Sequence, residues 1–455
     1  MPSRPVLRER RRRAPRTKIA LLTFGCAKNL VDSEVMAGCL AAAGYAFVDR
    51  PEAADVILLN TCGFLRAAKD EADEAISQAL ALKELRPLRR VVVAGCYPER
   101  NRPELRAAYP GVDAWLGVRD LDRIADVIEG RPFRGSDRTF LYGDRSPRAI
   151  STPASWAYLK ISEGCSHRCA FCAIPSIKGP YRSRPAASIL REAEALLERG
   201  VLEIDLVSQD TTYYGKDRSR SPGLAGLLGG LAALRGLAWV RILYGYPDEI
   251  TDRLLEALRH PKVAPYLDIP FQHSEAAVVR RMSRAMPGPR ALRLLERIRR
   301  ALPEAAIRTS LIVGFPGEGR REFAGLRDFV RQAEFDHLGV FTYSREEGTP
   351  AYGLGDPVPE EEKRRRRDEI LEIQAGISAR KLSAWTGRTI DVLIEGPSED
   401  DPRLLIGRSR RQAPEVDGVV LVEGGSGAPT SAKPALLKVE ITSAGVYDLR
   451  GKPAS

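Results

Sequence analysis

Short uninterrupted apolar runs alternate with longer amphipathic stretches over the first part of the chain. The runs consist mainly of Val, Leu, Ile and Ala, and the clearest lie at 18–24, 55–60 and 91–94. The stretch at 33–43 favours a helix that Gly44 ends, and the stretch at 65–85, rich in Ala and Glu, favours a longer one. Because strands buried on both faces read as continuous apolar runs, this alternation predicts a parallel α/β sheet domain over residues 18–140.

The same alternation returns near residue 155 with a new set of runs. These candidate strands lie at 156–161, 204–207, 239–243, 266–269, 307–313 and 338–341. Helical patterns separate them, with clear examples at 187–199, 248–259 and 320–334. Strand and helix units in this order predict a partial (β/α) barrel over residues 151–381, with functional loops at the carboxyl ends of its strands.

The last part of the chain changes character. A charged stretch at 359–382 predicts a surface helix, and Gly, Pro and Ser turns then separate short apolar runs. These runs lie at 390–394, 403–406, 418–422, 436–441 and 446–449. They predict a small antiparallel β-barrel over residues 382–455, of the kind that binds nucleic acid or docks on protein. The predicted fold class is therefore α/β with a C-terminal β-barrel.

The net charge of +11 is concentrated at the N-terminus. Residues 1–18 hold seven Arg, Lys18 and a single Glu, which gives +7 there and leaves +4 for the rest of the chain. This composition predicts a disordered basic tail over residues 1–17. The tail could contact RNA by neutralising phosphates, or it could be a solvated extension without a catalytic role.

The cysteine content and the hydropathy indicate a cytoplasmic protein. No run of about 18 apolar residues occurs, so we expect no membrane span. The basic N-terminus also lacks the apolar segment of a signal peptide. Seven cysteines are too few for a secreted disulfide scaffold of this length. Their odd number and the clustering of three of them indicate reduced thiols.

Three cysteines, Cys165, Cys169 and Cys172, follow the first strand predicted for the barrel. Their spacing, C-x3-C-x2-C, offers three thiolates to one metal centre and no fourth. A cubane iron–sulfur cluster held in this way keeps one iron open to a small ligand. The alternative is a Cys3His zinc site that uses His167. Structural zinc sites usually take their ligands as two separated pairs, and no second pair follows here, so the spacing favours a [4Fe–4S] cluster.

A second set of cysteines shares a common position in the N-terminal domain. Cys26, Cys62 and Cys96 each come directly after a predicted strand. The carboxyl ends of parallel strands share one edge of a sheet, where ligands gather. We therefore expect these three thiols to converge and to hold a second [4Fe–4S] cluster. Cys39, in contrast, lies inside a predicted helix among Ala and Leu and is expected to pack.

With two cysteine triplets in this order, the chain resembles the methylthiotransferases, a family of radical S-adenosylmethionine (SAM) enzymes. The resemblance covers residues 18–450 and implies an N-terminal cluster domain, a radical SAM barrel and a C-terminal TRAM barrel. Within the family, the chain is most similar to the branch that modifies an aspartate of uS12, the twelfth protein of the small ribosomal subunit. The matching motifs lie at 23–34, 60–64, 158–161, 174–179, 182–184 and 209–215.

The resemblance implies a reaction with two SAM molecules and two [4Fe–4S] clusters. The cluster on Cys165, Cys169 and Cys172 would split one SAM into methionine and a 5′-deoxyadenosyl radical. This radical would abstract hydrogen from the β-carbon of the aspartate, a bond that acid–base groups cannot break. The cluster on Cys26, Cys62 and Cys96 would supply the sulfur, and the second SAM would supply the methyl group of a β-methylthio aspartate.

Further residues are candidates for SAM or substrate binding. The resemblance implies that Phe171 lies by the adenine, and the alternative is an aromatic residue that packs in the core. Arg308 is expected to point into the barrel, where it could pair with the SAM carboxylate. The other candidates are polar residues at one strand end and a glycine turn at another, where backbone could approach the cofactor: Gln209, Asp210, Gly314, Phe315 and Pro316.

Charged residues and a histidine near the expected mouth have open roles. Arg182 and Arg184 could anchor an acidic substrate or could be surface charges. Gln272 and His273 also follow a predicted strand, and a lone histidine is more often a satisfied structural residue. The sequence does not identify catalytic residues beyond the cluster ligands.

Two alternative functions compete with modification of uS12. One is methylthiolation of tRNA adenosine, but the tRNA-modifying branch carries asparagine at the position of Asp210, and tRNA binding usually needs a large basic surface. The other is a zinc-stabilised RNA-binding protein. The expected partners are uS12, an electron donor such as flavodoxin or ferredoxin, and RNA contacted by the tail or the TRAM barrel, with no membrane.

Overall fold

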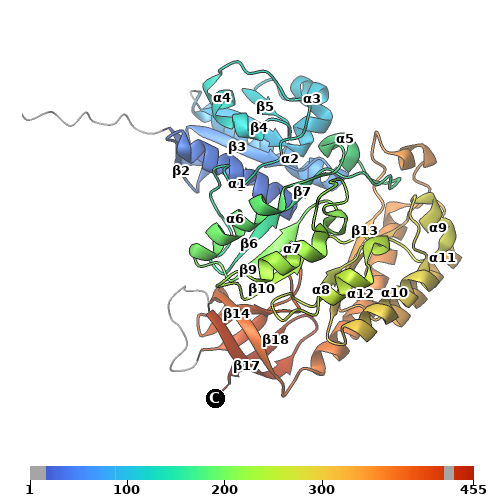
Figure 1. The fold of residues 1–455 in the computed structure, drawn as a ribbon. Coiled ribbons are helices and arrows are strands. Elements are labelled where there is room, and N and C mark those ends of the chain that lie inside the picture. Colours follow the sequence, from blue (N-terminus) through green and yellow to red (C-terminus); the bar gives the residue numbers. More distant parts are fainter. Residues whose placement is uncertain (1–16, 88, 425–434, 455) are drawn as a thin grey trace, which may run out of the picture. The chain divides into compact units, whose positions relative to one another are not determined.

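The computed structural model describes residues 17–87, 89–424 and 435–454 (Figure 1). Apart from Thr17, the predicted basic tail lies outside these residues. The chain divides into two compact units. Unit 1 draws its described residues from Met1–Gly63, Ala67–Ser136 and Ser146–Ala149, and unit 2 draws them from Phe64–Arg66, Asp137–Arg145 and Ile150–Ser455.

Unit 1 contains a parallel sheet in the strand order β2-β1-β3-β4-β5. The strands are β1 (Lys18–Thr23), β2 (Ala46–Phe47), β3 (Val56–Thr61), β4 (Arg90–Gly95) and β5 (Ala114–Leu116). The helices are α1 (Ala27–Ala42), α2 (Arg66–Leu85), α3 (Cys96–Ala108) and α4 (Ile124–Glu129), with 3-10 turns η1 (Pro51–Ala53) and η2 (Leu121–Arg123).

The parallel sheet predicted for the N-terminal part is confirmed. All of β3 is buried, and Ile76 of α2 packs with Ile57 and Val91 on one face of the sheet. Burial on both faces explains why these strands read as continuous apolar runs. The short edge strands β2 and β5 were not predicted, because two or three residues carry no periodic signal.

Unit 2 contains the partial barrel, as predicted. Its parallel strands form two sheets, β10-β9-β6 and β11-β12-β13. An isolated parallel bridge between Val240 and Val263 joins the two. The strands are β6 (Trp156–Lys160), β9 (Glu203–Val207), β10 (Trp239–Ile242), β11 (Tyr266–Asp268), β12 (Ala306–Val313) and β13 (His337–Thr342).

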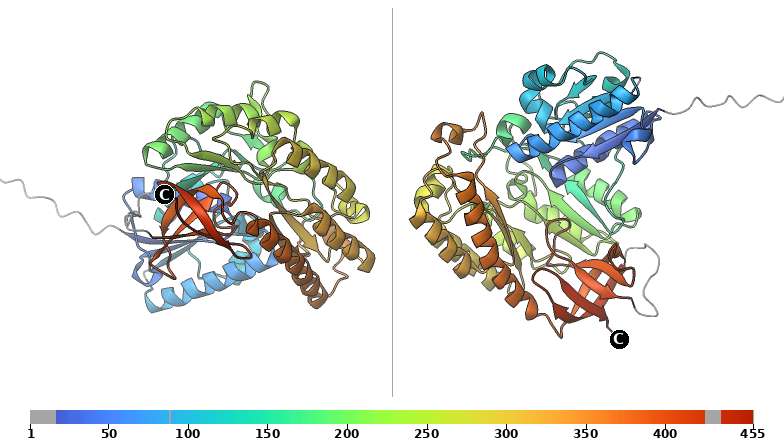
Figure 2. Two further views of the ribbon diagram at one scale, coloured as in Figure 1. Left: turned by 90° about the horizontal axis from the view of Figure 1, so that it is seen from below. Right: turned by 180° about the vertical axis from the view of Figure 1, so that it is seen from behind.

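Helices cover the outer face of this barrel, and the view from below shows the strands curving around a common interior (Figure 2). The helices are α6 (Ala186–Glu198), α7 (Gly223–Ala232), α8 (Asp252–Ala257), α9 (Ala276–Arg281), α10 (Gly288–Ala301), α11 (Arg320–Ala333) and α12 (Glu360–Ser383). Short elements complete the unit: β7 (Ser162–Glu163), β8 (Arg182–Ser183), α5 (Ile174–Lys178), η3 (Thr211–Tyr213), η4 (Pro247–Glu249) and η5 (Pro350–Leu354).

The C-terminal strands of unit 2 form a closed barrel in the order β14-β15-β16-β18-β17. They are β14 (Thr389–Pro397), β15 (Leu404–Ser409), β16 (Val420–Glu423), β17 (Ala435–Ala444) and β18 (Leu449–Pro453). Most neighbours are antiparallel, as predicted, but β16 and β18 run parallel. The run at 446–449 is largely a turn, because Gly445 N donates to Asp448 O, and β18 begins only at Leu449.

The connection between β15 and β16 reaches the barrel of parallel strands. Its backbone accepts hydrogen bonds from Arg241 of β10 and His337 of β13. His337 is the first residue of β13, and Arg241 pairs with Asp205 at the middle of β9, whereas the cysteine loop comes after the end of β6 and the short β7. The β15–β16 loop (410–419) therefore closes the end of the barrel opposite the cysteines. Among the described residues, no helix has an apolar stretch long enough to cross a bilayer.

Candidate functional site

Three turns of unit 1 hold Cys26, Cys62 and Cys96 at the carboxyl edge of its sheet. Cys26 is the N-cap of α1, Cys62 follows β3, and Cys96 begins α3. The turns touch one another: a Cβ on Gly25 would lie 2.7 Å from Cβ and 3.3 Å from Sγ of Cys62. Cys96 Sγ lies 3.8 Å from Oδ1 of Asn29, in the first turn of α1. The three thiols thus share one edge, and their role as iron ligands stays a prediction.

A network of polar side chains fixes the conformation of the turns that carry Cys26 and Cys62. Asn60 Nδ2 donates to Asn29 O and to Ser33 Oγ, at 2.8 Å each. Asn29 Nδ2 donates to Phe24 O at 2.8 Å, and Thr23 Oγ1 donates to Ser33 Oγ at 2.6 Å. These bonds give a physical reason for the sequence motifs at 23–34 and 60–64, since the polar side chains tie the ends of β1 and β3 to the first turns of α1.

The cysteine loop of unit 2, residues 164–173, is held through its backbone. Cys165 N donates to Gly179 O at 3.0 Å, and Ala170 N donates to Met282 O at 2.9 Å. Cys165 is buried, whereas Cys169 and Cys172 are half-buried, and none of these thiols forms a disulfide. Among the described residues, no three His, Cys, Asp or Glu side chains already stand in metal-ligand geometry. The fit to a cluster rests on the donor set, three soft thiols on one short loop.

Burial keeps the thiols of Cys165 and Cys172 protonated until a metal arrives. It raises the pKa of Cys165 to about 11 and the pKa of Cys172 to about 12, and the charge of the neighbouring thiols acts in the same direction. A thiolate is the form that binds iron. Cluster assembly at this loop must therefore release protons.

Two residues predicted to bind SAM or substrate contact the cysteine loop and the strand before it. Asp210 Oδ2 lies 2.6 Å from Nε2 of His167, while its Oδ1 accepts from the backbone of Thr212 and caps η3. Gln209 Nε2 donates to Glu163 at 3.0 Å. Both residues thus anchor the loop to the end of β9. Their contact with a bound ligand stays a prediction.

A buried ion cluster lies beneath the same loop. Lys160 Nζ lies 2.7 Å from Oε2 of Glu163, and Lys178 Nζ lies 3.6 Å from Oε1. Burial opposes ionisation of this carboxyl, but the two ammonium groups outweigh it and hold the pKa of Glu163 below its usual range. The cluster ties β6, β7 and α5 together around the cysteines.

The predicted glycine turn supports the cysteine loop through packing. Phe315 is fully buried in a cluster that includes Ala170, with Phe171 at its margin. Gly314 has φ +76, and a Cβ there would lie 2.4 Å from Cγ of Lys363. The stem of Lys363 therefore occupies the space that this glycine leaves open. Pro316, which is also buried, completes the turn. Contact of these residues or Phe171 with SAM stays a prediction.

The structure assigns structural roles to the uncertain residues near the mouth. His273 is fully buried, with Nε2 3.1 Å from Oε2 of Glu318, which agrees with the structural reading of a lone histidine. Arg184 is neither a surface charge nor an accessible anchor: it is 1% exposed and pairs with Glu192 at 2.7 Å. Arg182 donates to the carbonyl of Thr139. Gln272 has φ +71 and pairs through its backbone with β12.

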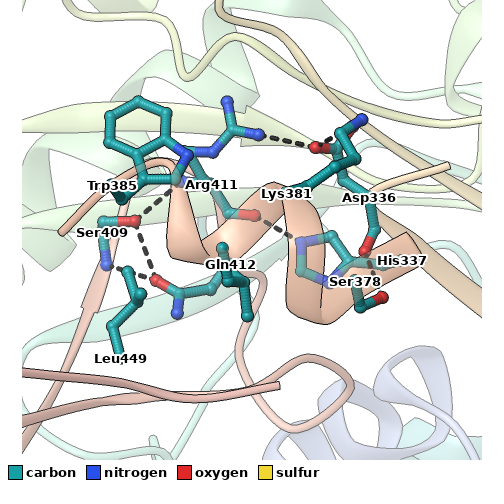
Figure 3. Close-up of a pocket in the computed structure, with 10 residues that line it drawn as sticks. Asp336, His337, Ser378, Lys381, Trp385, Ser409, Arg411, Gln412 and Leu449 are labelled. Atoms are coloured by element: carbon teal, nitrogen blue, oxygen red, sulfur yellow. Dashed lines mark hydrogen bonds and ion pairs between the residues drawn. The ribbon is translucent and has the colours of Figure 1, made fainter. Parts of the chain in front are cut away.

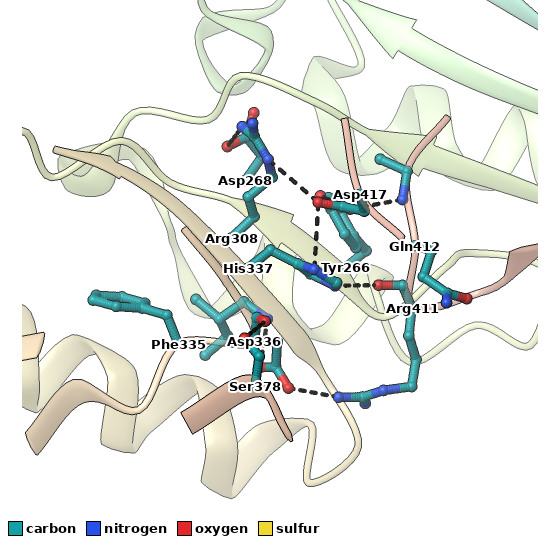
Figure 4. Close-up of polar contacts among 12 residues, drawn as sticks. Tyr266, Asp268, Arg308, Phe335, Asp336, His337, Ser378, Arg411, Gln412 and Asp417 are labelled. Carbon is teal, nitrogen blue, oxygen red and sulfur yellow. Dashed lines mark hydrogen bonds and ion pairs between the residues drawn. The ribbon is translucent and has the colours of Figure 1, made fainter. Parts of the chain in front are cut away.

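Arg308 points into the barrel, but acidic side chains already occupy its guanidinium. Nη1 donates to Asp268 at 3.2 Å, and Nε lies 3.5 Å from Oδ1 of Asp417 in the β15–β16 loop (Figure 4). Tyr266 donates to the same Asp417 carboxylate at 2.6 Å, and Nδ1 of His337 lies 3.4 Å from it. Through these contacts Arg308 joins β11 and β12 to the β15–β16 loop, which closes this end of the barrel. Its pairing with a SAM carboxylate stays a prediction.

Ionic contacts continue across this closed end. Glu203 pairs with Arg241 at 2.8 Å and with Arg408 of β15 at 2.9 Å, and all three side chains are almost completely buried. Asp205 lies 3.2 Å from Arg241. Burial, reinforced by the charge of Glu203, raises the pKa of Asp205 well above its usual range. The interior of the barrel is thus polar where the C-terminal barrel meets it.

A small pocket lies at the same junction, between α12, β13 and the C-terminal barrel (Figure 3). Asp336 forms ion pairs there with Lys381 at 2.9 Å and with Arg411 at 2.6 Å. Because it lies at the opposite end of the strands from the cysteine loop, the pocket belongs to the docking of the two barrels. Its lining is Asp336, His337, Ser378, Lys381, Leu382, Trp385, Ser409, Arg411, Gln412 and Leu449.

Several residues around the cysteine loop were missed by sequence reasoning. Glu163, Tyr246 and Arg284 approach the loop or its supports from different elements, and no fixed spacing connects them. Lys160 could have been found, because it lies in a strand whose residues are all buried, on the same face as Tyr158 two positions earlier. A buried charge needs an ionic partner, and Glu163 provides it.

Family models match three parts of the chain. Residues 18–117 match the uncharacterized protein family UPF0004, residues 159–330 match the radical SAM superfamily, and residues 386–453 match a TRAM domain. The structure of the radical SAM methyltransferase TsrM from Kitasatospora setae resembles 74% of this chain, with a TM-score of 0.53 and 14% identity, over 77% of its own length. At this identity the likeness speaks for the fold alone.

Curated relatives match nearly the whole chain. A ribosomal protein uS12 methylthiotransferase RimO from Geobacter sulfurreducens is 42% identical over 96% of this chain and 98% of its own length. The protein of the same name from Heliobacterium modesticaldum is 44% identical over 96% of this chain and 95% of its own length. Identity at this level and coverage shows the family, and the two cysteine triplets lie within the matched parts. The chain therefore belongs to the ribosomal protein uS12 methylthiotransferase family of radical SAM proteins.

Proposed function

We propose that this protein is a transferase that adds a methylthio group to the β-carbon of an aspartate in ribosomal protein uS12. The observation that carries the proposal is the near-complete match to relatives of that name, combined with two separate sets of three thiols. We further propose cytoplasmic action, a flavodoxin or ferredoxin as electron donor, and RNA contact by the TRAM barrel, for which the domain match is the support.

The residues fit two iron–sulfur clusters. Cys26, Cys62 and Cys96 would hold one, and Cys165, Cys169 and Cys172 the other. When bound, the clusters and SAM would supply the electron, the radical and the sulfur that an unactivated C–H bond requires. Three thiols per cluster would leave one iron of each open to a ligand.

The protein's own task is to hold these ligands and to restrict water around them. The network of Asn29, Ser33 and Asn60 fixes the turns of the first thiol set. Asp210 and Gln209 fix the second loop through His167 and Glu163. We propose that the half-buried Phe171, together with Gln209, Asp210 and the turn at 314–316, contributes to the SAM pocket, since all of these contact or flank the cysteine loop.

Iron, sulfide and product analysis test the proposal. The full chain, assembled anaerobically, should hold about eight irons and eight sulfides, and the Cys26→Ala/Cys62→Ala/Cys96→Ala variant about four of each. With SAM and a reductant, the full chain should increase the mass of the aspartate-bearing uS12 peptide, and neither this variant nor Cys169→Ala should do so.

Competing outcomes are distinct in the same assay. With tRNA offered beside uS12, a mass increase on tRNA alone would reject the assignment in favour of the tRNA-modifying branch. Bound zinc without sulfide would reject an enzyme of this class altogether.

A further inference from the structure

Arg284 lies outside the cysteine motif, yet its side chain reaches a thiol within it. Nη1 donates a hydrogen bond to Cys169 Sγ at 3.4 Å. Nη2 donates to the carbonyl of Pro270, which follows β11, at 2.6 Å. Arg284 itself lies after α9. One guanidinium therefore joins the cysteine loop to two other elements of the barrel mouth.

An aromatic stack holds the guanidinium in this position. Its Cζ lies 4.1 Å from the ring centroid of Tyr246, within the range of a cation–π interaction. The imidazole of His167 stacks on the same ring, with centroids 3.7 Å apart and planes 7° apart. His167 in turn contacts Asp210 at 2.6 Å. Arg284 is thus fixed by a carbonyl, an aromatic ring and a sulfur.

The charge of Arg284 is not cancelled by a carboxylate. Among the described residues it forms no ion pair with Asp or Glu, and its side chain is half-buried. Partial burial limits the screening of its charge by water. The positive charge therefore acts on the sulfur that it contacts.

We propose that Arg284 is a positioning residue that sets the reduction potential of the iron–sulfur cluster held by Cys165, Cys169 and Cys172. This inference rests on the proposed function, because it requires that cluster. A cubane with three thiolates gains one negative charge when it takes up an electron. A cationic N–H donor on a ligand sulfur stabilises the more negative state, so it raises the potential. Arg284 thereby makes the cluster easier for a weak biological donor to reduce.

Potentiometric titration followed by electron paramagnetic resonance tests the proposal without substrate. The full chain carrying Cys26→Ala, Cys62→Ala and Cys96→Ala leaves a single cluster to observe. In this background, Arg284→Gln should lower the ratio of reduced to oxidised cluster about tenfold at the parent midpoint, which corresponds to about 59 mV for one electron. Arg284→Lys keeps the charge but cannot hold both acceptors, so its shift should have the same sign and be smaller.

Arg280→Gln is the matched control, because Arg280 is an exposed arginine on the neighbouring α9 and its loss changes the net charge equally. Its midpoint should equal that of the parent. If Arg284→Gln does not retain iron, the test uses Arg284→Lys instead. A preparation of this variant with four irons should have a midpoint potential below that of the parent. Unchanged midpoints in both Arg284 variants, or an equal shift in Arg280→Gln, overturn this inference alone. A parent chain that assembles no cluster overturns the proposed function as well.

Discussion

Gly164 shows how tightly single residues constrain the cysteine loop. It precedes Cys165 and has φ +79, a backbone conformation that favours glycine. A Cβ there would lie 2.2 Å from the carbonyl oxygen of Pro180 and 2.6 Å from that of Gly179. Backbone atoms cannot yield as a flexible side chain can, so the start of the loop has one conformation.

Gly164→Ala should therefore destabilise the fold more than the backbone strain of a positive φ alone would. We expect it to lower the free energy of unfolding by more than about 2 kcal/mol and to reduce the iron bound by unit 2. Gly200→Ala is the matched control, with φ +97 and open space around the missing Cβ, and it should cost about 1 kcal/mol with no loss of iron. Urea unfolding and iron analysis provide the two readouts, and equal losses in both variants would contradict the clash.

Residues with local spacing were predictable, and so were the three thiols that each follow a strand of one sheet, whereas side-chain contacts between unlike positions of the barrel were not. The cysteines of unit 2 lie within eight positions of one another, so their pattern is visible in the sequence. Arg284 contacts Cys169 from 115 positions away, and Gln209 contacts Glu163 from 46 positions away. Neither pair has a periodicity or motif that could reveal it before the strands are placed.

At the scale of elements, the barrel strands carry apolar residues outward and polar residues inward. Ile204 and Leu206 of β9 pack in the core under the helices, whereas Glu203 and Asp205 pair with Arg241 of β10. The outward residues made these strands predictable. The inward ones mark a barrel end that is filled by charge instead of by an aliphatic core.

Asp205→Asn should stabilise the protein at neutral pH. Burial and the charge of Glu203 raise the pKa of Asp205 in the folded state. A carboxyl with a raised pKa favours folding most below its usual pKa, and this contribution is lost as pH rises toward the folded value. The neutral amide avoids that cost, so we expect a gain of about 1 kcal/mol at pH 8 that shrinks toward pH 4, measured by urea unfolding.

Asp336→Asn is the control, because its effect on stability should have the opposite sign. Burial opposes ionisation there, but Arg411 and Lys381 outweigh it and lower the pKa of Asp336. Its contribution is present above the usual carboxyl pKa and is lost as pH falls. This substitution should therefore destabilise at pH 8 and have a decreasing effect toward pH 4. The same sign for both variants would refute these assignments.

Element boundaries were less predictable than element types. The structure extends the first helix back to Ala27, directly after Cys26, whereas the sequence pattern began it at residue 33. The turn at 445–448 was included in a strand because Val446 and Tyr447 are apolar, yet both are exposed. Hydrophobic patterns cannot distinguish an apolar turn from a short strand end.

At the scale of the whole molecule, the C-terminal barrel contributes to the interior of the radical SAM barrel. Glu415 accepts a hydrogen bond from Tyr158 at 2.8 Å, Asp417 accepts one from Tyr266, and Arg408 pairs with Glu203. The sequence predicted a separate small barrel for binding or docking. It could not show this junction, because the contacting residues are far apart in the sequence. Tyr266 and Asp417 are separated by 151 positions, and Tyr158 and Glu415 by 257.

Arg408→Met should destabilise both barrels together. It leaves Glu203 with one cationic partner and removes the ion pair of Glu395, and breaking a buried pair typically costs about 3 to 5 kcal/mol. Hydrogen exchange should increase in β9 and β10 as well as in β14 and β15. Arg403→Met is the matched control in the same barrel, because Arg403 is 87% exposed and pairs locally with Asp401. Faster exchange confined to β14 and β15 would show that the barrels unfold independently.

The junction between the barrels also affects how the chain folds during its synthesis. Glu203, Asp205 and Arg241 leave the ribosome well before Arg408, Glu415 and Asp417, by roughly 8 to 43 s at about 5 to 20 residues per second. Until those last residues emerge, Glu203 lacks its ion pair with Arg408, and Arg241 lacks the carbonyl of Arg410 to which it donates. Translation that stops before residue 408 should therefore release a chain that quality-control proteases degrade, so the cell would not accumulate a barrel that lacks its final segment.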